Sequence, residues 1–122
     1  MHIDLRSDTA TRPTPGMLQA MMNAKVGDDV FGEDLSIIEL QNKTAELFGM
    51  EAGLFCPSGT MTNQIAIKTH TQPGDELICD SNAHIYNYEG GGIAFNSGVQ
   101  AKLLLGDRGR ITAEQIAEQI NP

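Results

Sequence analysis

The residues best suited to bind a ligand form the turn Ser58-Gly59-Thr60, which lies between a short apolar run and a segment with helical spacing. From Gly53 to His70 we therefore expect a strand, a tight turn and a helix. The first N–H groups of such a helix lack partners and lie at the positive end of its dipole, so they favour an anion such as phosphate. Gly59 permits close approach of a ligand, and the two hydroxyls add donors. Plain N-capping without a ligand is the commoner role of these residue types and stays an alternative.

The composition limits the kind of partner. A chain of 122 residues with 40% apolar and 20% charged residues is typical of a globular protein. It has no apolar run of transmembrane length and no signal-peptide core near its start, which predicts a cytoplasmic location. The net charge of −8 argues against nucleic acid and anionic membrane as partners. Cys56 and Cys79 lie in apolar runs without zinc-site spacing, so we expect buried thiols and no metal.

The N-terminal part of the chain predicts little core. Residues 1–14 are polar and broken by proline, which favours an extended arm. Thr14 as N-cap and Pro15 at the first helical position predict a helix to about Ala24. The acidic stretch 26–35 predicts a solvated loop, with a loop that lines a site as the alternative.

The rest of the chain alternates between helical and extended patterns. Ser36 and Glu39 have the spacing of a capping box, and Gly49 is suited to end the helix that they open. Thr112 and Gln115 predict a second capping box near the C-terminus. Strands are expected in residues 54–56, 76–80 and 99–105.

This alternation predicts an α/β fold with a mostly parallel sheet and flanking helices. Because a parallel sheet usually has more than three strands, the chain resembles the front part of a larger unit. We therefore expect a single partial domain over residues 1–122, in which the arm, short helix and acidic loop occupy 1–35 and the first β/α units fill 36–122.

A second group of polar residues follows the strand at 76–80. Residues 80–88, DSNAHIYNY, come directly after this strand, and ligands of open α/β sheets bind at that edge. The run Gly90-Gly91-Gly92 could cradle a phosphate, but a turn or close helix packing is favoured without a flanking strand.

Taken together, four segments resemble the N-terminal part of the low-specificity L-threonine aldolases, which are pyridoxal-phosphate enzymes of the aspartate-aminotransferase fold type. The segments are IDLRSDTATRPTPGM (Ile3 to Met17), VGDDVFGEDLSI (Val26 to Ile37), LFCPSGTMTNQIA (Leu54 to Ala66) and HIYNYEGGGIA (His84 to Ala94). Their order and separations are more specific than any one motif. The resemblance implies the incomplete N-terminal half of the large domain of a pyridoxal-phosphate-dependent transferase-like fold.

The resemblance also assigns site residues. Ser58, Gly59 and Thr60 would hold the phosphate of pyridoxal 5'-phosphate, in agreement with the helix N-terminus argument. His84 would stack on the pyridine ring and is a candidate catalytic base, and Ser7 would help to bind the carboxylate of the substrate. Arg6 is predicted to form a structural ion pair and Glu89 to act at most indirectly, while no metal is implied.

The implied reaction is the reversible cleavage of a β-hydroxy-α-amino acid, threonine or allo-threonine, to glycine and an aldehyde such as acetaldehyde. The implied enzyme is a cytoplasmic homo-oligomer, expected to be a homotetramer, which acts on a small amino acid in threonine breakdown and glycine formation. None of the four lysines lies in a segment like the family's Schiff-base lysine motif, so the chain alone is expected to be inactive. These lysines are Lys25, Lys43, Lys68 and Lys102.

Two other functions stay open from the sequence. The chain could be a non-catalytic α/β module that binds a phosphorylated metabolite through residues 58–60, or a degenerate fragment without a ligand. Cofactor absorption and glycine release distinguish the aldolase from both alternatives.

Overall fold

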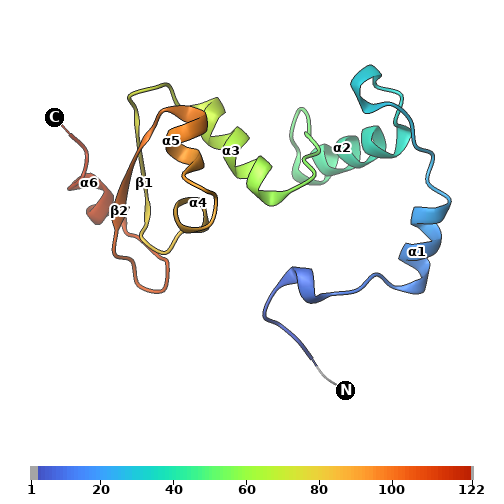
Figure 1. Ribbon diagram of the computed structural model, residues 1–122, viewed down its shortest axis with the longest axis horizontal. Helices are drawn as coiled ribbons and strands as arrows, with labels where there is room; N and C mark the ends of the chain where they lie inside the picture. Colours follow the sequence, from blue (N-terminus) through green and yellow to red (C-terminus); the bar gives the residue numbers. More distant parts are fainter. Residues whose placement is uncertain (1–2, 122) are drawn as a thin grey trace. The chain divides into compact units, whose positions relative to one another are not determined.

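A computed structural model describes residues 3–121 of the chain (Figure 1). The chain divides after Phe55 into two compact units, which are described separately below. Over the described range, none of the helices combines the length and apolar character needed to cross a membrane.

In its described residues, the first unit contains two α-helices and two short 3-10 helices. Its elements are η1 (Asp8–Ala10), α1 (Pro15–Met22), η2 (Asp29–Phe31) and α2 (Leu35–Phe48). The predicted start of α1 is confirmed, because the Thr14 hydroxyl accepts a hydrogen bond from the Met17 amide and Pro15 is the first helical residue. The predicted end of α2 is also confirmed, since Gly49 adopts a left-handed conformation with φ of 63°.

The capping box predicted at Ser36 is wrong, because the N-cap of α2 is Asp34, two residues earlier. Asp34 accepts hydrogen bonds from the amides of Ile37 at 2.9 Å and Gly27 at 3.2 Å. These two bonds, the one from Ile37 first, lower the pKa of Asp34. Ser36 lies inside the helix and donates to the carbonyl of Lys25 at 2.9 Å. Asp34 therefore fixes both the start of α2 and the loop that leads into it.

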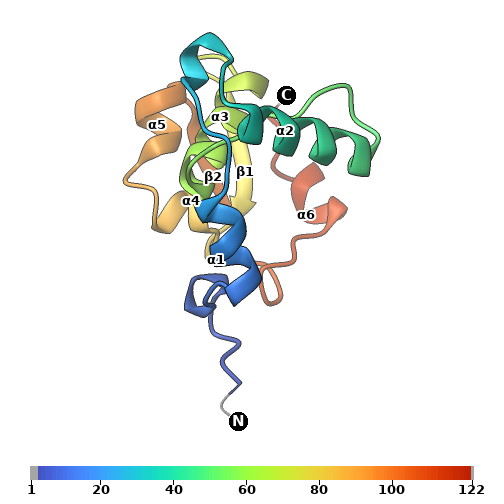
Figure 2. The same cartoon turned by 90° about the vertical axis from the view of Figure 1, so that its right-hand side faces the viewer.

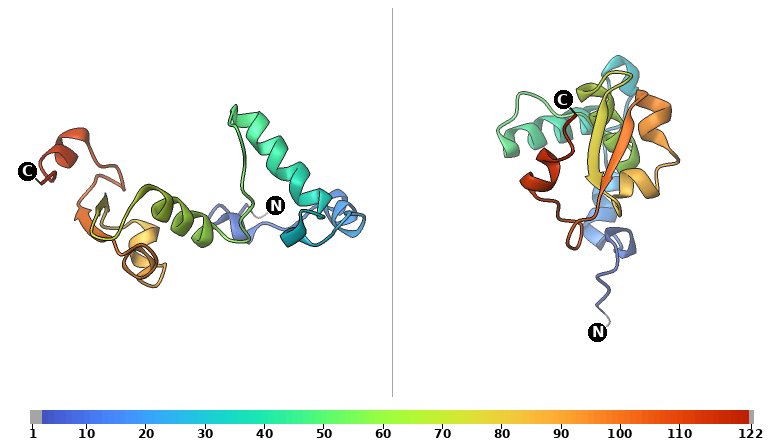
Figure 3. Two further views of the ribbon diagram at one scale, coloured as in Figure 1. Left: turned by 90° about the horizontal axis from the view of Figure 1, so that it is seen from above. Right: turned by 90° about the vertical axis from the view of Figure 1, so that its left-hand side faces the viewer.

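The second unit is built around a parallel pair of strands. Its elements are α3 (Gly59–His70), β1 (Glu76–Asp80), α4 (His84–Asn87), α5 (Gly92–Ser97), β2 (Gln100–Leu104) and α6 (Ala113–Ala117). The strands β1 and β2 pair from Glu76↔Gln100 to Asp80↔Leu104. Figures 2 and 3 show α6 on one side of the strand pair and α4 and α5 on the other. The predicted parallel α/β architecture is confirmed.

A small apolar core joins α3 and α5 to the strands. Ile67, Ile93 and Val99 are buried together, and Leu77, Ile85 and Ala101 pack against them from the strands and α4. On the other side of the pair, the Lys102 ammonium donates to the carbonyl of Gln119 at 2.7 Å and lies 3.2 Å from the Glu76 carboxylate. The helix α6 begins with the capping box predicted at Thr112 and Gln115.

The strand predicted at residues 54–56 is wrong. These residues are not in a strand, and β1 and β2 are the strands found in the described part of the chain. The amide of Phe55 donates instead to the side chain of Gln41 in α2 at 2.8 Å, and Leu54 is 70% exposed. An apolar run becomes a strand only where a neighbouring strand can accept its backbone hydrogen bonds, and here a side chain supplies the acceptor.

Asp80 ends β1 and fixes the two loops beyond the strands. It is buried, and its carboxylate accepts hydrogen bonds from the amides of Asn82 and Gly106, both at 2.8 Å. Asn82 lies in the short connection to α4, whereas Gly106 follows β2. Asp80 therefore holds the segment that leads to His84 at the carboxyl edge of the sheet.

Replacing Asp34 by alanine is predicted to speed hydrogen exchange at the amides of Ile37 and Gly27, because both lose their acceptor. Loss of an N-cap corresponds to roughly a 5- to 30-fold increase in exchange rate. Glu39→Ala is the matched control, since it removes the acid of the capping box that the sequence suggested. Equal effects of the two variants on these amides would restore Ser36 and Glu39 as the cap.

Replacing Asp80 by alanine is predicted to lower the free energy of unfolding by about 2 kcal/mol, because two amides lose their acceptor in a partly buried place. Denaturant titration followed by circular dichroism measures this change. Asp75→Ala is the control, since exposed Asp75 accepts one amide hydrogen bond in a turn, from Gln72 at 2.7 Å. A loss no greater than that of the control would contradict the central role of Asp80.

Candidate functional site

The turn Ser58-Gly59-Thr60 opens α3, as the sequence predicts. Ser58 is the N-cap, and its hydroxyl accepts a hydrogen bond from the Met61 amide at 3.1 Å. Ser58 therefore does cap the helix, but its hydroxyl accepts a hydrogen bond from only one of the first amides of α3. The amides of Gly59 and Thr60 lie in the first turn and have no acceptor within the helix. They lie at the positive end of a helix of 12 residues.

The start of α3 has room for a ligand. A Cβ atom added to Gly59 would have no atom of the described chain within 4 Å, apart from its immediate surroundings in the helix. Ser58 and Thr60 line a shallow hollow on α3 together with Gln64, Lys68 and Asn96. The turn therefore combines unpaired donors with open space, which are features that an anionic group needs.

One turn further along α3, two amide side chains hold a buried carboxylate. Asn63 donates to Oε1 of Glu89 at 2.7 Å, and Gln64 donates to Oε2 at 2.6 Å. Nδ1 of His84 lies 2.9 Å from the same Oε1. The Glu89 side chain has 0% exposed surface, so these contacts replace the water that it has lost. Glu89 thereby links α3 to α4.

The environment of Glu89 decides its charge. Burial raises the pKa of Glu89, but hydrogen bonds from Asn63, Gln64 and His84 favour the ionised form and together leave the pKa below its usual value. A carboxylate with a lowered pKa stabilises the fold above its unfolded pKa, and this contribution is lost as the pH falls through the folded pKa. Glu89 is therefore ionised at neutral pH and acts only as an acceptor.

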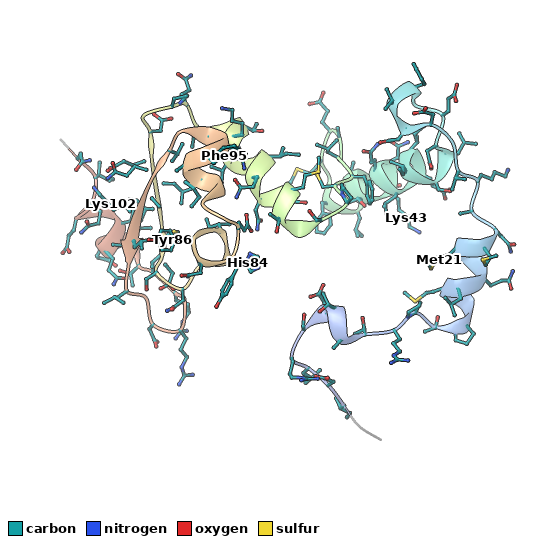
Figure 4. All side chains as sticks on the ribbon, viewed as in Figure 1. Met21, Lys43, His84, Tyr86, Phe95 and Lys102 are labelled. Carbon is teal, nitrogen blue, oxygen red and sulfur yellow. The ribbon has the colours of Figure 1, made fainter. Side chains whose placement is uncertain are left out.

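His84 is the first residue of α4. Its side chain contacts Glu89 through one ring nitrogen and is otherwise largely exposed. Its ring centroid lies 5.3 Å from that of Tyr88, with the two planes at 41°. The side chain of His84 is 63% exposed, although Glu89 fixes one of its nitrogens. Figure 4 shows His84 projecting from α4, while Lys102 lies toward α6. The imidazole is thus oriented but accessible.

Glycine makes this contact between helices possible. A Cβ atom on Gly92 would lie 2.5 Å from the side chain of Gln64, so a larger residue at this position would displace the Gln64 amide that approaches Glu89. Gly91 precedes α5 with φ of 71° and supports the tight turn. The triple glycine serves a turn and close helix packing, as predicted.

The turn and His84 are connected through α3. Asn63 follows Gly59 by four residues and Gln64 follows Thr60 by four, so each pair shares a face of the helix. Glu89 is bound to those same two amide side chains. Through Glu89, His84 is therefore linked to the two faces of α3 that carry Gly59 and Thr60.

Ser7 belongs to the first unit and has a local structural role. Its hydroxyl caps η1, accepting from the Thr9 amide at 3.3 Å, and it shares a hydrogen bond with the Thr9 hydroxyl at 2.9 Å. Arg6 forms an ion pair with Asp4 at 2.6 Å, which confirms the structural role predicted for it.

Sequence reasoning underestimated Glu89 and did not single out Asn63 or Gln64. Glu89 is separated from its two partners on α3 by 26 and 25 residues, so no local spacing connects them. The sequence does contain one indication, because Asn63 and Gln64 are two amide side chains that follow Gly59 and Thr60 by one helical turn.

The residues of the turn and His84 differ in what they offer a ligand. The Ser58-Gly59-Thr60 turn supplies amide and hydroxyl donors, and His84 supplies an aromatic ring on a largely exposed side chain. Pyridoxal 5'-phosphate has a phosphate and an aromatic ring, so the residues present fit this cofactor.

Comparisons with known proteins identify the family of the chain. Residues 4–122 match the family described as beta-eliminating lyase. The low-specificity L-threonine aldolase of Eremothecium gossypii is 43% identical over 98% of this chain and 32% of its own length. The enzyme of that name from Escherichia coli K12 is 44% identical over 98% and 36%, respectively. Low-specificity L-threonine aldolase 1 of Arabidopsis thaliana is 50% identical over 82% and 28%.

The chain spans about a third of the length of these relatives. Their names agree with the resemblance found in the four sequence segments, which is thereby confirmed. Because the family match covers residues 4–122, the chain belongs to the beta-eliminating lyase family.

Proposed function

We propose that the chain is the N-terminal part of a pyridoxal-phosphate-dependent L-threonine aldolase. The complete protein would cleave a β-hydroxy-α-amino acid, threonine or allo-threonine, to glycine and an aldehyde such as acetaldehyde. The observation that carries this proposal is the connection of the Ser58-Gly59-Thr60 turn to His84 through α3 and Glu89. The shared name of the aldolase relatives supports the substrate class.

In this proposal the turn binds the phosphate of the cofactor. The amides of Gly59 and Thr60 donate to the phosphate, and the Ser58 hydroxyl can still donate its proton while its oxygen caps the helix. When bound, pyridoxal 5'-phosphate supplies an electron sink for breaking the bond between Cα and Cβ. The protein's task at this end of the site is to hold and orient the anion.

His84 has two compatible tasks in the proposal. Its ring stacks on the pyridine ring and restricts the orientation of the cofactor. Its second nitrogen, Nε2, can accept the proton of the substrate hydroxyl when the imidazole is neutral. Stacking is the principal role, because the ring is held on one side and accessible on the other.

The remaining partners are part of the same proposal. Ser7 would contribute its hydroxyl to the carboxylate of the substrate in a complete, cytoplasmic homo-oligomer. The chain by itself is proposed to be inactive. Among its lysines, Lys102 donates to the carbonyl of Gln119 and pairs with the carboxylate of Glu76, which supports a structural role for this residue in the proposal.

The first test completes the chain with the remaining segment of the Escherichia coli relative. With pyridoxal 5'-phosphate and L-threonine, the completed protein is predicted to show visible absorption that borohydride abolishes, and to release glycine. The chain alone should release none. Gly59→Asp should abolish the absorption, because it places a negative side chain in the open space at the turn. Gly16→Asp, the same change near the start of exposed α1, is the matched control.

Two other outcomes of this test would overturn the aldolase proposal. Binding of pyridoxal 5'-phosphate that Gly59→Asp removes, but without borohydride-sensitive absorption or glycine release, would favour a non-catalytic phosphate-binding module. Neither binding nor turnover would indicate a fragment without a ligand.

The second test separates the two tasks of His84 in the completed protein. His84→Phe keeps a flat ring and should leave the cofactor Kd nearly unchanged, whereas His84→Ala should weaken binding by roughly three- to tenfold, the contribution of one aromatic contact. If Nε2 also accepts the substrate proton, both variants should lower kcat by about 10²- to 10⁴-fold. The same changes at exposed His70 are controls. Equal cofactor affinity for the two His84 variants would rule out stacking.

A further inference from the structure

Glu89 is surrounded by hydrogen-bond donors. Asn63 and Gln64 point their side-chain NH2 groups at its two oxygens, and Nδ1 of His84 is the third nitrogen in contact. The Glu89 side chain is completely buried, so these nitrogens are its polar surroundings among the described residues. The aldolase assignment does not by itself explain why a buried carboxylate should occupy this place.

The charge of Glu89 determines which nitrogen of His84 carries the proton. The hydrogen bonds from Asn63 and Gln64 contribute to the lowered pKa of Glu89, so the group is a carboxylate and cannot donate. The contact of 2.9 Å with His84 is then a hydrogen bond only if Nδ1 carries a hydrogen. A neutral His84 must therefore leave Nε2 unprotonated.

The carboxylate cannot readily turn away from this contact. Gln64 is itself oriented, because its Oε1 accepts a hydrogen bond from Asn96 at 3.0 Å while its Nε2 donates to Glu89. Reversal of the Gln64 amide would break both bonds. Gly92 leaves the space in which the Gln64 side chain lies. The orientation of Glu89 is thus set from α3 and α5 together.

We propose that Glu89 is a positioning residue that holds neutral His84 with its proton on Nδ1, and so presents Nε2 as a hydrogen-bond acceptor on the accessible side of the ring. Asn63 and Gln64 hold the carboxylate in place for this purpose. A role of this arrangement in aldol cleavage rests on the proposed function, whereas the position of the proton on the His84 ring does not depend on it.

The test is imidazole ¹⁵N NMR on the full chain at a pH of about 8.5, where ordinary histidines are neutral. The chain has three histidines, and loss of a signal in His84→Phe assigns residue 84. Wild-type His84 is expected to be predominantly in the Nδ1–H form. In Glu89→Gln, the ratio of Nδ1–H to Nε2–H should fall by roughly ten- to a hundredfold, the equivalent of one hydrogen bond to a charged group. The signals of His70 should not change.

Gly92→Ala offers an independent variant that leaves both Glu89 and His84 in place. Its methyl group would displace the Gln64 side chain, so the Nδ1–H fraction of His84 should fall in the same direction but by less than in Glu89→Gln. Lys68→Ala, on the same helix but without a recorded bond to Glu89, is the control.

A wild-type His84 in the Nε2–H form would overturn the proposal, even if Glu89→Gln failed to fold. An unchanged ratio in a folded Glu89→Gln protein would overturn it as well. Because the readout requires neither cofactor nor substrate, it separates the two hypotheses. The predicted tautomer in a protein that failed the cofactor test would contradict the aldolase function alone.

Discussion

The hydrogen bonds around the buried Glu89 carboxylate are the constraint on which the candidate site depends. They join Asn63 and Gln64, in the middle of α3, to His84 at the start of α4. A buried carboxylate lowers the stability of the fold unless its oxygens accept hydrogen bonds. The helices α3 and α4 therefore cannot separate without exposing Glu89 or leaving it buried without donors. The start of α3 and the imidazole are consequently parts of one arrangement, although they come from different β/α segments.

The strands and helices around this arrangement show which features a local sequence pattern can predict. The strands predicted from the apolar runs at 76–80 and 99–105 form as β1 and β2, because the two runs pair with each other. The run at 54–56 has the same character, but its Phe55 amide is bonded to a side chain of α2. Asp34 and Ser36 are both residue types suited to cap α2, and the hydrogen bonds from Ile37 and Gly27 identify Asp34 as the actual cap. Local sequence patterns thus predicted the elements, while hydrogen-bond partners distant in the sequence decided which residues the elements include.

The candidate site divides in the same way. A helix N-terminus with Ser58-Gly59-Thr60 is a local feature, and the turn was predicted together with its capping alternative. The importance of Glu89 could not be predicted from spacing, because its bonds to α3 join residues 25 and 26 positions apart. His84 was singled out by its place after β1 and by family resemblance, but the nitrogen that Glu89 holds is evident only in the fold. Chemistry that depends on proton position requires the tertiary structure.

The central claim is that the start of α3 and His84 hold the two ends of one phosphorylated aromatic cofactor. Amide and imidazole NMR of the completed protein, titrated with pyridoxal 5'-phosphate and then with unphosphorylated pyridoxal, tests it most directly. Pyridoxal 5'-phosphate should shift the amide signals of Gly59 and Thr60 together with the ring signals of His84. Unphosphorylated pyridoxal should leave the two amide signals unshifted. Equal amide shifts with both compounds, or shifts confined to other parts of the chain, would contradict it.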